Sequence, residues 1–153
     1  VDAAASCSTC KLKVQYECRQ NGPSVAMIEY SIKVVNTGTT AIPLSDVSVR
    51  YWYTIDGTGG QAGSCNSTDH PCTVTFQSNT PAKTKADELG VISFSGGMLA
   101  PGADTGEVQI EIFATGMYTQ TNDYSFTNSG ANFLDETNVT GYIAGKLVWG
   151  TAP

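Results

Sequence analysis

The sequence predicts an all-β fold, a sandwich of two antiparallel sheets, and three observations support this class. Apolar and polar residues alternate with a period of two along several segments, as they do in half-buried strands. No segment of helical length shows an apolar stripe with a 3.6-residue period. Turn-forming pairs such as Asp56-Gly57 and Pro101-Gly102 separate the segments at the intervals expected for short strands.

Seven segments carry the strand pattern and are rich in β-branched or aromatic residues, which is enough for eight to nine short strands. They span residues 11–18, 25–35, 47–55, 73–77, 90–94, 106–114 and 141–149. The last segment contains a turn at Ala144-Gly145. Because Ala disfavours positive φ, we expect a turn in which Gly145 alone has positive φ. Residues 57–72 lack apolar periodicity and predict an extended surface loop.

The length of 153 residues fits one domain, so we expect a single module over 1–153, with 1–10 as a candidate N-terminal extension. The net charge of −6 and the absence of a basic run argue against nucleic-acid and anionic-membrane partners. The sequence has no apolar segment of the roughly 18–20 residues that span a bilayer, and VDAAAS does not resemble a signal peptide. Low charge with abundant Thr, Ser and Gly favours an extracellular location.

Five cysteines suggest an oxidising compartment. Cys65 and Cys72 bracket a short loop that a disulfide would close, and we expect Cys7 or Cys10 to bridge to Cys18. The alternative is a zinc site made by Cys7, Cys10 and some of Cys65, His70 and Cys72. For such a site the chain lacks a second C-x-x-C or a paired His.

Oxygen-bearing side chains crowd the stretch MYTQTNDYSF over residues 117–126. Calcium selects oxygen ligands and takes about six to eight of them, so a second segment must contribute. YTIDG over 53–57 offers Thr54 and Asp56 at a spacing that places both on one side of an extended chain. The alternative is that Asn122 and Asp123 only form Asx-turns.

Four stretches in order resemble the family 3 carbohydrate-binding module, the cellulose-binding module of cellulosome scaffoldins and bacterial cellulases. They are VVNTGTTAIPLSDVSVRYWYTIDG (34–57), ISFSGGMLAPGA (92–103), YTQTNDYSF (118–126) and VTGYIAGKLVWG (139–150). The resemblance implies a nine-stranded jelly-roll sandwich of two antiparallel sheets with a structural calcium. The ligand positions that it implies fall on Thr54, Asp56, Thr119, Asn122 and Asp123.

The resemblance also implies a flat strip that packs on glucose rings, and here the sequence departs from the family. VQIEIFATGMYTQ over 108–120 lacks the family's Arg and Trp. The remaining strip candidates are Tyr118 as an aromatic contact, Glu111 as a polar anchor, and Asp69 with His70 as a displaced pair. The alternatives are that Asp69 and His70 are solvated loop residues and that Tyr118 covers a sheet edge.

A shallow groove on the opposite sheet is the second surface that the resemblance implies, with Arg50, Trp52 and Tyr124 at its positions. Alternation places Arg50 and Trp52 on one face of their strand, with Tyr51 and Tyr53 on the other. The alternatives are that Trp52 packs on its own sheet and that Arg50 pairs with a carboxylate.

We therefore expect a non-catalytic module that targets its parent protein to cellulose or a related β-glucan. The alternative is a module that has lost crystalline-cellulose binding and acts as a structural, sensory or protein-contact module through the groove. Its contact there would be a peptide linker or a neighbouring catalytic domain. An enzyme is disfavoured because His70 is the sole histidine and no nucleophile elbow is present. Asp135 and Glu136 are adjacent and would point to opposite faces of an extended segment.

Overall fold

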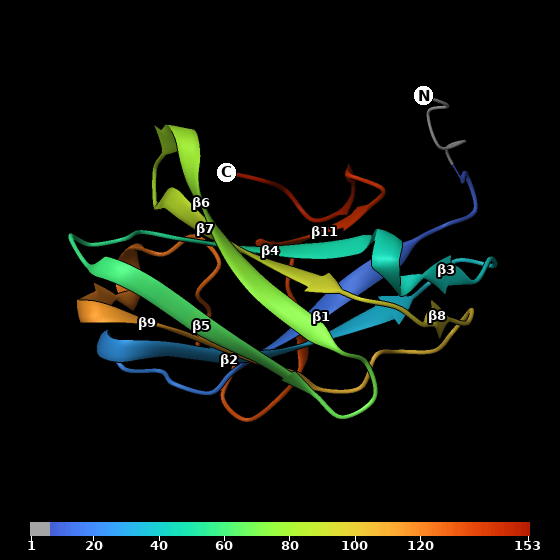
Figure 1. Ribbon diagram of the computed structural model, residues 1–153, viewed down its shortest axis with the longest axis horizontal. Helices are drawn as coiled ribbons and strands as arrows, with labels where there is room; N and C mark the ends of the chain where they lie inside the picture. The colour runs from blue at the N-terminus through green and yellow to red at the C-terminus, as the bar shows by residue number, and fades with distance from the viewer. Residues whose placement is uncertain (1–6) are drawn as a thin grey trace.

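The computed structural model describes residues 7–153, which form two five-stranded antiparallel sheets and a two-stranded one (Figure 1). The first sheet has the order β10 (Leu134–Asp135), β1 (Leu12–Cys18), β2 (Ser24–Asn36), β9 (Val108–Thr119) and β5 (Gly59–Ser67). The second has the order β12 (Lys146–Trp149), β11 (Val139–Ile143), β4 (Val47–Tyr53), β7 (Ala86–Phe94) and β6 (Cys72–Lys83). The small sheet pairs β3 (Ile42–Pro43) with β8 (Met98–Leu99).

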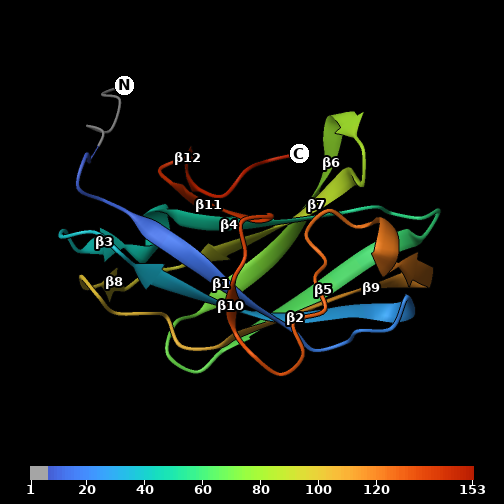
Figure 2. The same ribbon diagram turned by 180° about the vertical axis from the view of Figure 1, so that it is seen from behind.

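The predicted sandwich is confirmed, because nine of these strands, counted over residues 7–153, have four residues or more. The second sheet lies above the first in Figure 1, and β1 and β10 come to the front in Figure 2. Two short 3₁₀ turns, η1 (Leu44–Asp46) and η2 (Gln120–Asn122), complete the described elements. Within this part of the chain no helix has the length and apolar character needed to cross a membrane.

The core lies between the sheets and follows the period-two pattern of the strands. In β1, alternate residues are buried, which directs Leu12, Val14 and Tyr16 inward. Tyr30 and Tyr51 face each other from opposite sheets, with ring centroids 4.2 Å apart. The alternation in the sequence is therefore sufficient to say which face of β1 is buried.

The predicted surface loop over 57–72 is wrong, because most of it forms β5, which pairs with β9. Its composition of Gly, Ser, Ala and Asn hides this role, since such residues are poor strand formers. At Gly63 an added Cβ would lie 2.7 Å from the Glu111 carbonyl oxygen and 2.8 Å from the Phe76 ring. A glycine is thus needed where the edge strand approaches its neighbours closely.

The cysteine pairing also differs from the prediction. The Cys65–Cys72 disulfide is confirmed, but Cys7 pairs with Cys10, and Cys18 is a buried free thiol. Cys10 lies just before β1 and Cys18 at its end, and the extended strand separates its own two ends by about 20 Å. A disulfide needs Cα atoms within about 7 Å. With the other four cysteines in disulfides, the zinc alternative is excluded as well.

The final hairpin corrects the predicted turn. Its two central residues, Ala144 and Gly145, have φ values of 50° and 78°, so both adopt positive φ. Ile143 pairs with Lys146, which fixes a two-residue loop. The twist of the strands favours this type I′ geometry, although positive φ at Ala144 lowers the stability of the turn.

Candidate functional site

Four oxygen-bearing side chains converge at one end of the sandwich, and we call them the oxygen cluster. Thr54 and Asp56 follow the end of β4, while Asn122 and Asp123 lie at and just after η2. The backbone N–H of Thr54 donates to Asp123 Oδ1 at 2.8 Å, and the Asn122 side-chain amide donates to Asp56 Oδ1 at 2.8 Å. The two segments named in the sequence therefore do meet in the fold.

The contacts at the Thr54 hydroxyl are unusual for a purely hydrogen-bonded site. Thr54 Oγ1 lies 3.0 Å from Asp56 Oδ1 and 3.1 Å from Asp123 Oδ1, and it also contacts Asn122 Oδ1. All three neighbours are acceptors, and a hydroxyl has a single proton to donate. Four electron-rich oxygens facing one another in this way form a donor set suited to a hard cation.

Asp123 is the least satisfied member of the oxygen cluster. Its side chain is 4% exposed, and its Oδ2 is buried with no hydrogen-bond partner in the described chain. Burial raises the pKa of Asp123 to about 7, although hydrogen bonds from Thr54 act in the opposite direction. A buried carboxylate with a free oxygen is costly unless a proton or a cation compensates its charge.

Thr119 stands apart from the other predicted ligands. Its backbone N–H donates to Asp56 Oδ2 at 2.7 Å, while its side chain is exposed. Residues 7–153 contain no cluster of three or more His, Cys, Asp or Glu side chains placed to hold a metal. A cation here would therefore depend on neutral oxygens as well as on the two carboxylates.

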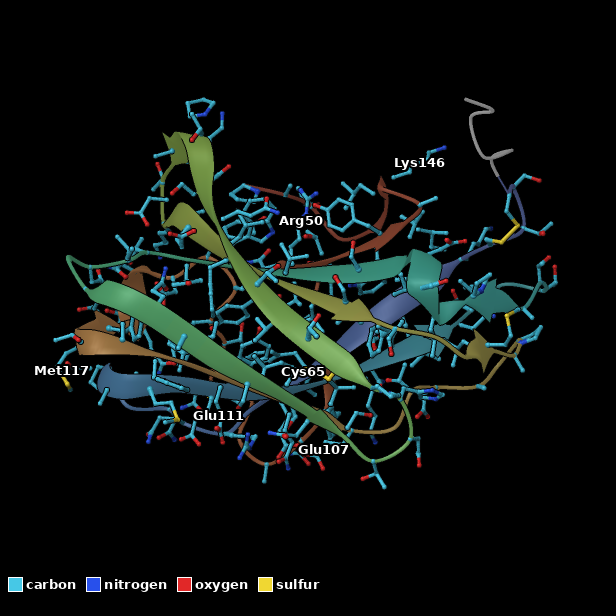
Figure 3. All side chains as sticks on the ribbon, in the orientation of Figure 1. Arg50, Cys65, Glu107, Glu111, Met117 and Lys146 are labelled. Carbon is cyan, nitrogen blue, oxygen red and sulfur yellow. A yellow bond between two sulfur atoms is a disulfide. The ribbon has the colours of Figure 1, made fainter. Side chains whose placement is uncertain are left out.

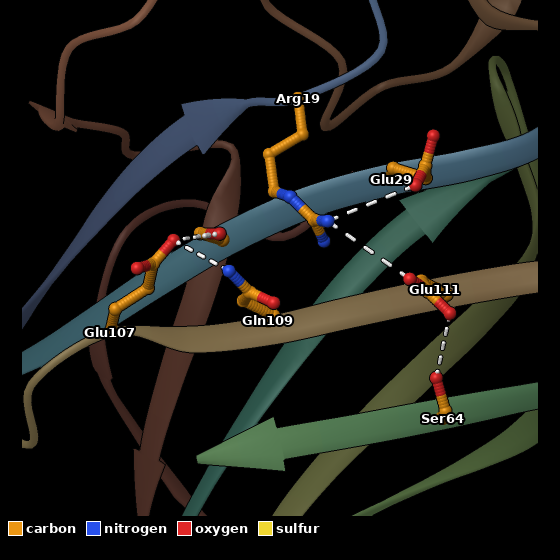
Figure 4. A network of polar contacts seen from close by, with 7 residues as sticks. Arg19, Glu29, Ser64, Glu107, Gln109 and Glu111 are labelled. Carbon is orange, nitrogen blue, oxygen red and sulfur yellow. Dashed lines mark hydrogen bonds and ion pairs between the residues drawn. The ribbon is translucent and has the colours of Figure 1, made fainter. Parts of the chain in front are cut away.

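The outer face of the first sheet carries a charged network, which Figure 4 shows from close by. We call this outer face the β9 face. Its residues are Glu29, Ser64, Gln109, Glu111 and Phe113. Glu29 and Glu111 are directly opposite each other across β2 and β9, and Arg19 lies 3.8 Å and 4.0 Å from them. The Ser64 hydroxyl donates to Glu111 at 3.0 Å. The predicted polar anchor Glu111 thus lies within a half-exposed network.

Phe113 is the aromatic residue of this face that the sequence reasoning missed. It is 38% exposed and pairs with Met27 on one side and Ala62 on the other. Alternation along β9 could have found it, because Phe113 has the same parity as Glu111. The same parity argument places Tyr118 with Ile112, on the inner face.

The predicted surface contact at Tyr118 is wrong for this reason. Its side chain is fully buried, and its hydroxyl donates to Gln61 at 3.1 Å. Asp69 is exposed and borders a shallow polar pocket of about 490 Å³ beside the Cys65–Cys72 disulfide. His70 instead lies against the turn at Gly97, and no hydrogen bond joins it to Asp69 in the described structure.

The outer face of the second sheet, which we call the β4 face, brings the groove candidates together. Its residues are Arg50, Trp52, Tyr124, Thr140 and Tyr142. The Arg50 guanidinium lies 4.1 Å from the Tyr142 ring centroid and 5.9 Å from that of Trp52. Trp52 is 5% exposed and donates to Thr140 at 2.9 Å, so it packs on its own sheet.

Arg50 is the accessible cation of the β4 face. No carboxylate among residues 7–153 forms an ion pair with it, and its Nε is buried without a hydrogen-bond partner. Figure 3 shows Arg50 on one side of the sandwich and Glu107 and Glu111 on the other. The molecule thus carries a cation over largely buried aromatic rings on one side and a carboxylate-rich face on the other.

Comparisons with known proteins agree on one family. The profile of the family 3 carbohydrate-binding modules, described as a cellulose binding domain, matches residues 13–150. The β-mannanase/endoglucanase A of Caldicellulosiruptor saccharolyticus is 36% identical over 155 residues, which cover 94% of this chain. The chain spans 11% of the length of that relative.

Two solved structures have nearly the same fold. A family 3a module from the cellulosome scaffoldin of Clostridium thermocellum superposes with a TM-score of 0.87 at 34% identity, covering 95% of this chain and 92% of that one. A biomass-sensing module from an RsgI-like protein of Clostridium thermocellum gives a TM-score of 0.87 at 31% identity, covering 94% and 99%.

Proposed function

Because this chain belongs to the family 3 carbohydrate-binding modules, which bind polysaccharide and are not catalytic, we propose that it attaches a larger parent protein to cellulose or a related β-glucan outside the cell. The chain's match to a small part of a polysaccharide-degrading relative supports this arrangement. Its acidic, weakly charged composition suits an uncharged polymer better than an anionic one.

The β9 face is the proposed polysaccharide-binding surface, and exposed Phe113 is the observation that supports it. An aromatic ring can pack on the apolar face of a sugar, while neighbouring polar groups hydrogen-bond its hydroxyls. Glu111 precedes Phe113 by two residues on β9, and Glu29 on β2 and Ser64 on β5 lie opposite Glu111, so all three offer such groups. Arg19 holds the two glutamates in place.

The composition of this face favours single, hydrated chains over crystalline cellulose. A crystalline surface requires several coplanar rings, but Phe113 is the only aromatic among the strongly exposed large apolar residues of the described chain. Carboxylates can accept hydrogen bonds from the hydroxyl groups along the edge of a separate polysaccharide chain. We therefore expect amorphous cellulose or a soluble β-glucan to bind more tightly than microcrystalline cellulose.

A depletion binding assay tests this proposal, with microcrystalline cellulose, acid-swollen cellulose, xylan and chitin as polymers. We expect the tightest binding to acid-swollen cellulose, and a loss of about tenfold with Phe113→Ala. Met98→Ala, which truncates an exposed apolar residue on β8, serves as the matched control. Equal binding by both variants on every polymer would contradict the assignment to the β9 face.

The second candidate function is recognition of a partner through the β4 face. Arg50, which lies over Tyr142 with no carboxylate partner in residues 7–153, is the observation that favours it. Such a face could serve a sensory or protein-contact module. Retention on none of the four polymers would favour this candidate.

We further propose that the oxygen cluster holds a structural calcium ion. Side-chain oxygens would come from Thr54, Asp56, Asn122 and Asp123, and the backbone N–H of Thr119 holds the Asp56 carboxylate in place. The buried, unpartnered Asp123 Oδ2 supports this fit. Calcium supplies positive charge that stabilises the two meeting segments, and it takes part in no reaction.

Thermal unfolding in EDTA and in calcium tests the metal proposal independently of polymer binding. With calcium at about a thousand times its Kd, we expect a gain of about 4 kcal/mol in the free energy of unfolding. Magnesium at the same concentration should have a much smaller effect, since it prefers a rigid octahedral site. An unchanged melting temperature in EDTA and calcium would refute the assignment.

A further inference from the structure

A pocket of about 760 Å³ lies at the end of the sandwich opposite the oxygen cluster, where β1, β3 and β12 come together. In Figure 2 this is the end at which β3 and β12 lie. Its floor is apolar and includes Leu12, Ile42, Val148 and Trp149. Neither the β9 face nor the β4 face contributes a residue to it.

The rim of this pocket is basic, although the protein is acidic overall. The chain has 8 Lys and Arg against 14 Asp and Glu, yet Lys11, Lys13 and Lys146 all border the pocket. Asp46 is the single acidic residue among the described residues that line it. Lys13 pairs with Asp135 at 3.1 Å, whereas Lys11 and Lys146 form no ion pair within residues 7–153. Two cations are therefore available to a ligand.

Unpaired strand edges border the same pocket. Strand β12 is the last strand of its sheet. β10 pairs with β1 at Gln15 and Tyr16, and the Glu136 backbone N–H donates to the Val14 carbonyl, so this cover of β1 ends before Leu12. Leu12 and Lys13 both line the pocket although their side chains point to opposite faces of β1. The pocket therefore follows the edge of the strand, where backbone groups are free to pair with an added strand.

We propose that this pocket docks an extended acidic segment of a second protein chain. An apolar side chain of the segment would occupy the floor beside Val148 and Trp149, and flanking acidic residues would reach Lys11 and Lys146. A strand edge favours an extended peptide over a compact ligand. An uncharged β-glucan has neither the apolar side chain nor the negative charge, so this site goes beyond polysaccharide binding.

A fluorescence anisotropy titration of the full chain tests the proposal. The probe is a labelled synthetic peptide of eight residues, alternating Glu and Val, with Trp in place of one central Val. We expect saturable binding that weakens by about tenfold when Lys11→Glu and Lys146→Glu are combined. Lys83→Glu combined with Lys85→Glu makes the same charge change at the distant turn between β6 and β7, and should alter binding by less than about twofold.

A steric variant separates the pocket from its charge. Ala41→Trp narrows the pocket without changing the net charge, and we expect it to weaken peptide binding as well. Absence of saturable binding up to roughly 1 mM peptide would overturn the proposal. Equal weakening by the two lysine pairs would reduce the effect to overall charge, and tighter binding of polygalacturonate at the same lysines would assign the pocket to an acidic polysaccharide. Unchanged melting temperatures of the variants would show that folding is intact.

Discussion

The oxygen cluster and the β9 face are both built from carboxylates and their polar neighbours, but they differ in burial. Asp123 is 4% exposed and has an oxygen without a partner, whereas Glu29 and Glu111 are about a quarter to a third exposed and share Arg19. Water can solvate the second set of charges but is excluded from the first. Similar side chains therefore have very different energetic consequences in the two regions.

The difference also separates stability from recognition. A buried, electron-rich cluster that joins two segments can stabilise the fold if a cation enters it. A half-exposed network contributes little to folding, but its groups are free to meet a ligand. The experiments below test this contrast, beginning with the largest expected effect.

Replacement of the buried carboxylate should have the largest effect. In Asp123→Asn, we expect the stabilisation by calcium to fall from about 4 kcal/mol to below about 1 kcal/mol, because a charged ligand is lost. Without metal at pH 8, the variant should be more stable than the wild type by about 1–3 kcal/mol, because a buried unpaired charge is removed. Calorimetry with and without calcium measures both changes, and Asp135→Asn at the exposed surface is the control.

The pH dependence of the metal-free protein should reveal the same carboxylate. The pKa of Asp123 is raised from 3.8 to about 7, so the folded state binds the proton more tightly than the unfolded state. Protonation of Asp123 therefore adds about 2–4 kcal/mol to the free energy of unfolding. This contribution is fully present below about pH 4 and is lost as the pH rises through about 7. The difference between wild type and Asp123→Asn in urea unfolding isolates this contribution. A difference that does not vary with pH would contradict it.

The hairpin at Ala144 provides an intermediate reference, where an exposed residue carries a backbone cost. Ala144→Asn should stabilise the protein by about 0.5–1 kcal/mol, because Asn tolerates positive φ at this turn position. Chemical denaturation measures the gain, with Ala131→Asn at an exposed loop position without positive φ as the control. A loss of stability would show that another feature fixes the turn.

Removal of the exposed cation should have the smallest effect on folding. We expect Arg19→Gln to lower the free energy of unfolding by about 0.5 kcal/mol, since Glu29 and Glu111 then face each other without a bridge. The loss should nearly vanish in 1 M salt, where screening acts within about 3 Å. A salt-independent loss above about 2 kcal/mol would remove the contrast between the two regions.

Several parts of the fold and the site could be predicted from local pattern. Period-two alternation identified the inner faces of β1, β4 and β9, and the oxygen-rich stretches identified the residues that meet in the cluster. These features follow from the chain alone because strand alternation is a property of the backbone. The same rule predicts that Phe113 lies on the outer face of β9 and Tyr118 on the inner face, whereas the family resemblance had suggested a surface position for Tyr118.

Other features depended on which segments become neighbours. β5 is a strand because β9 pairs with it, and its glycines fit because Glu111 and Phe76 approach closely. Cys18 is free because its strand directs it into the core, away from Cys7 and Cys10. The three lysines gather at one pocket only when β1 and β12 meet at the end of the sandwich. The sequence by itself determined the faces of the strands and the oxygen donors, and the tertiary structure decided the edges, the cysteine pairing and the pocket, because these depend on cross-strand contacts between residues far apart in the chain.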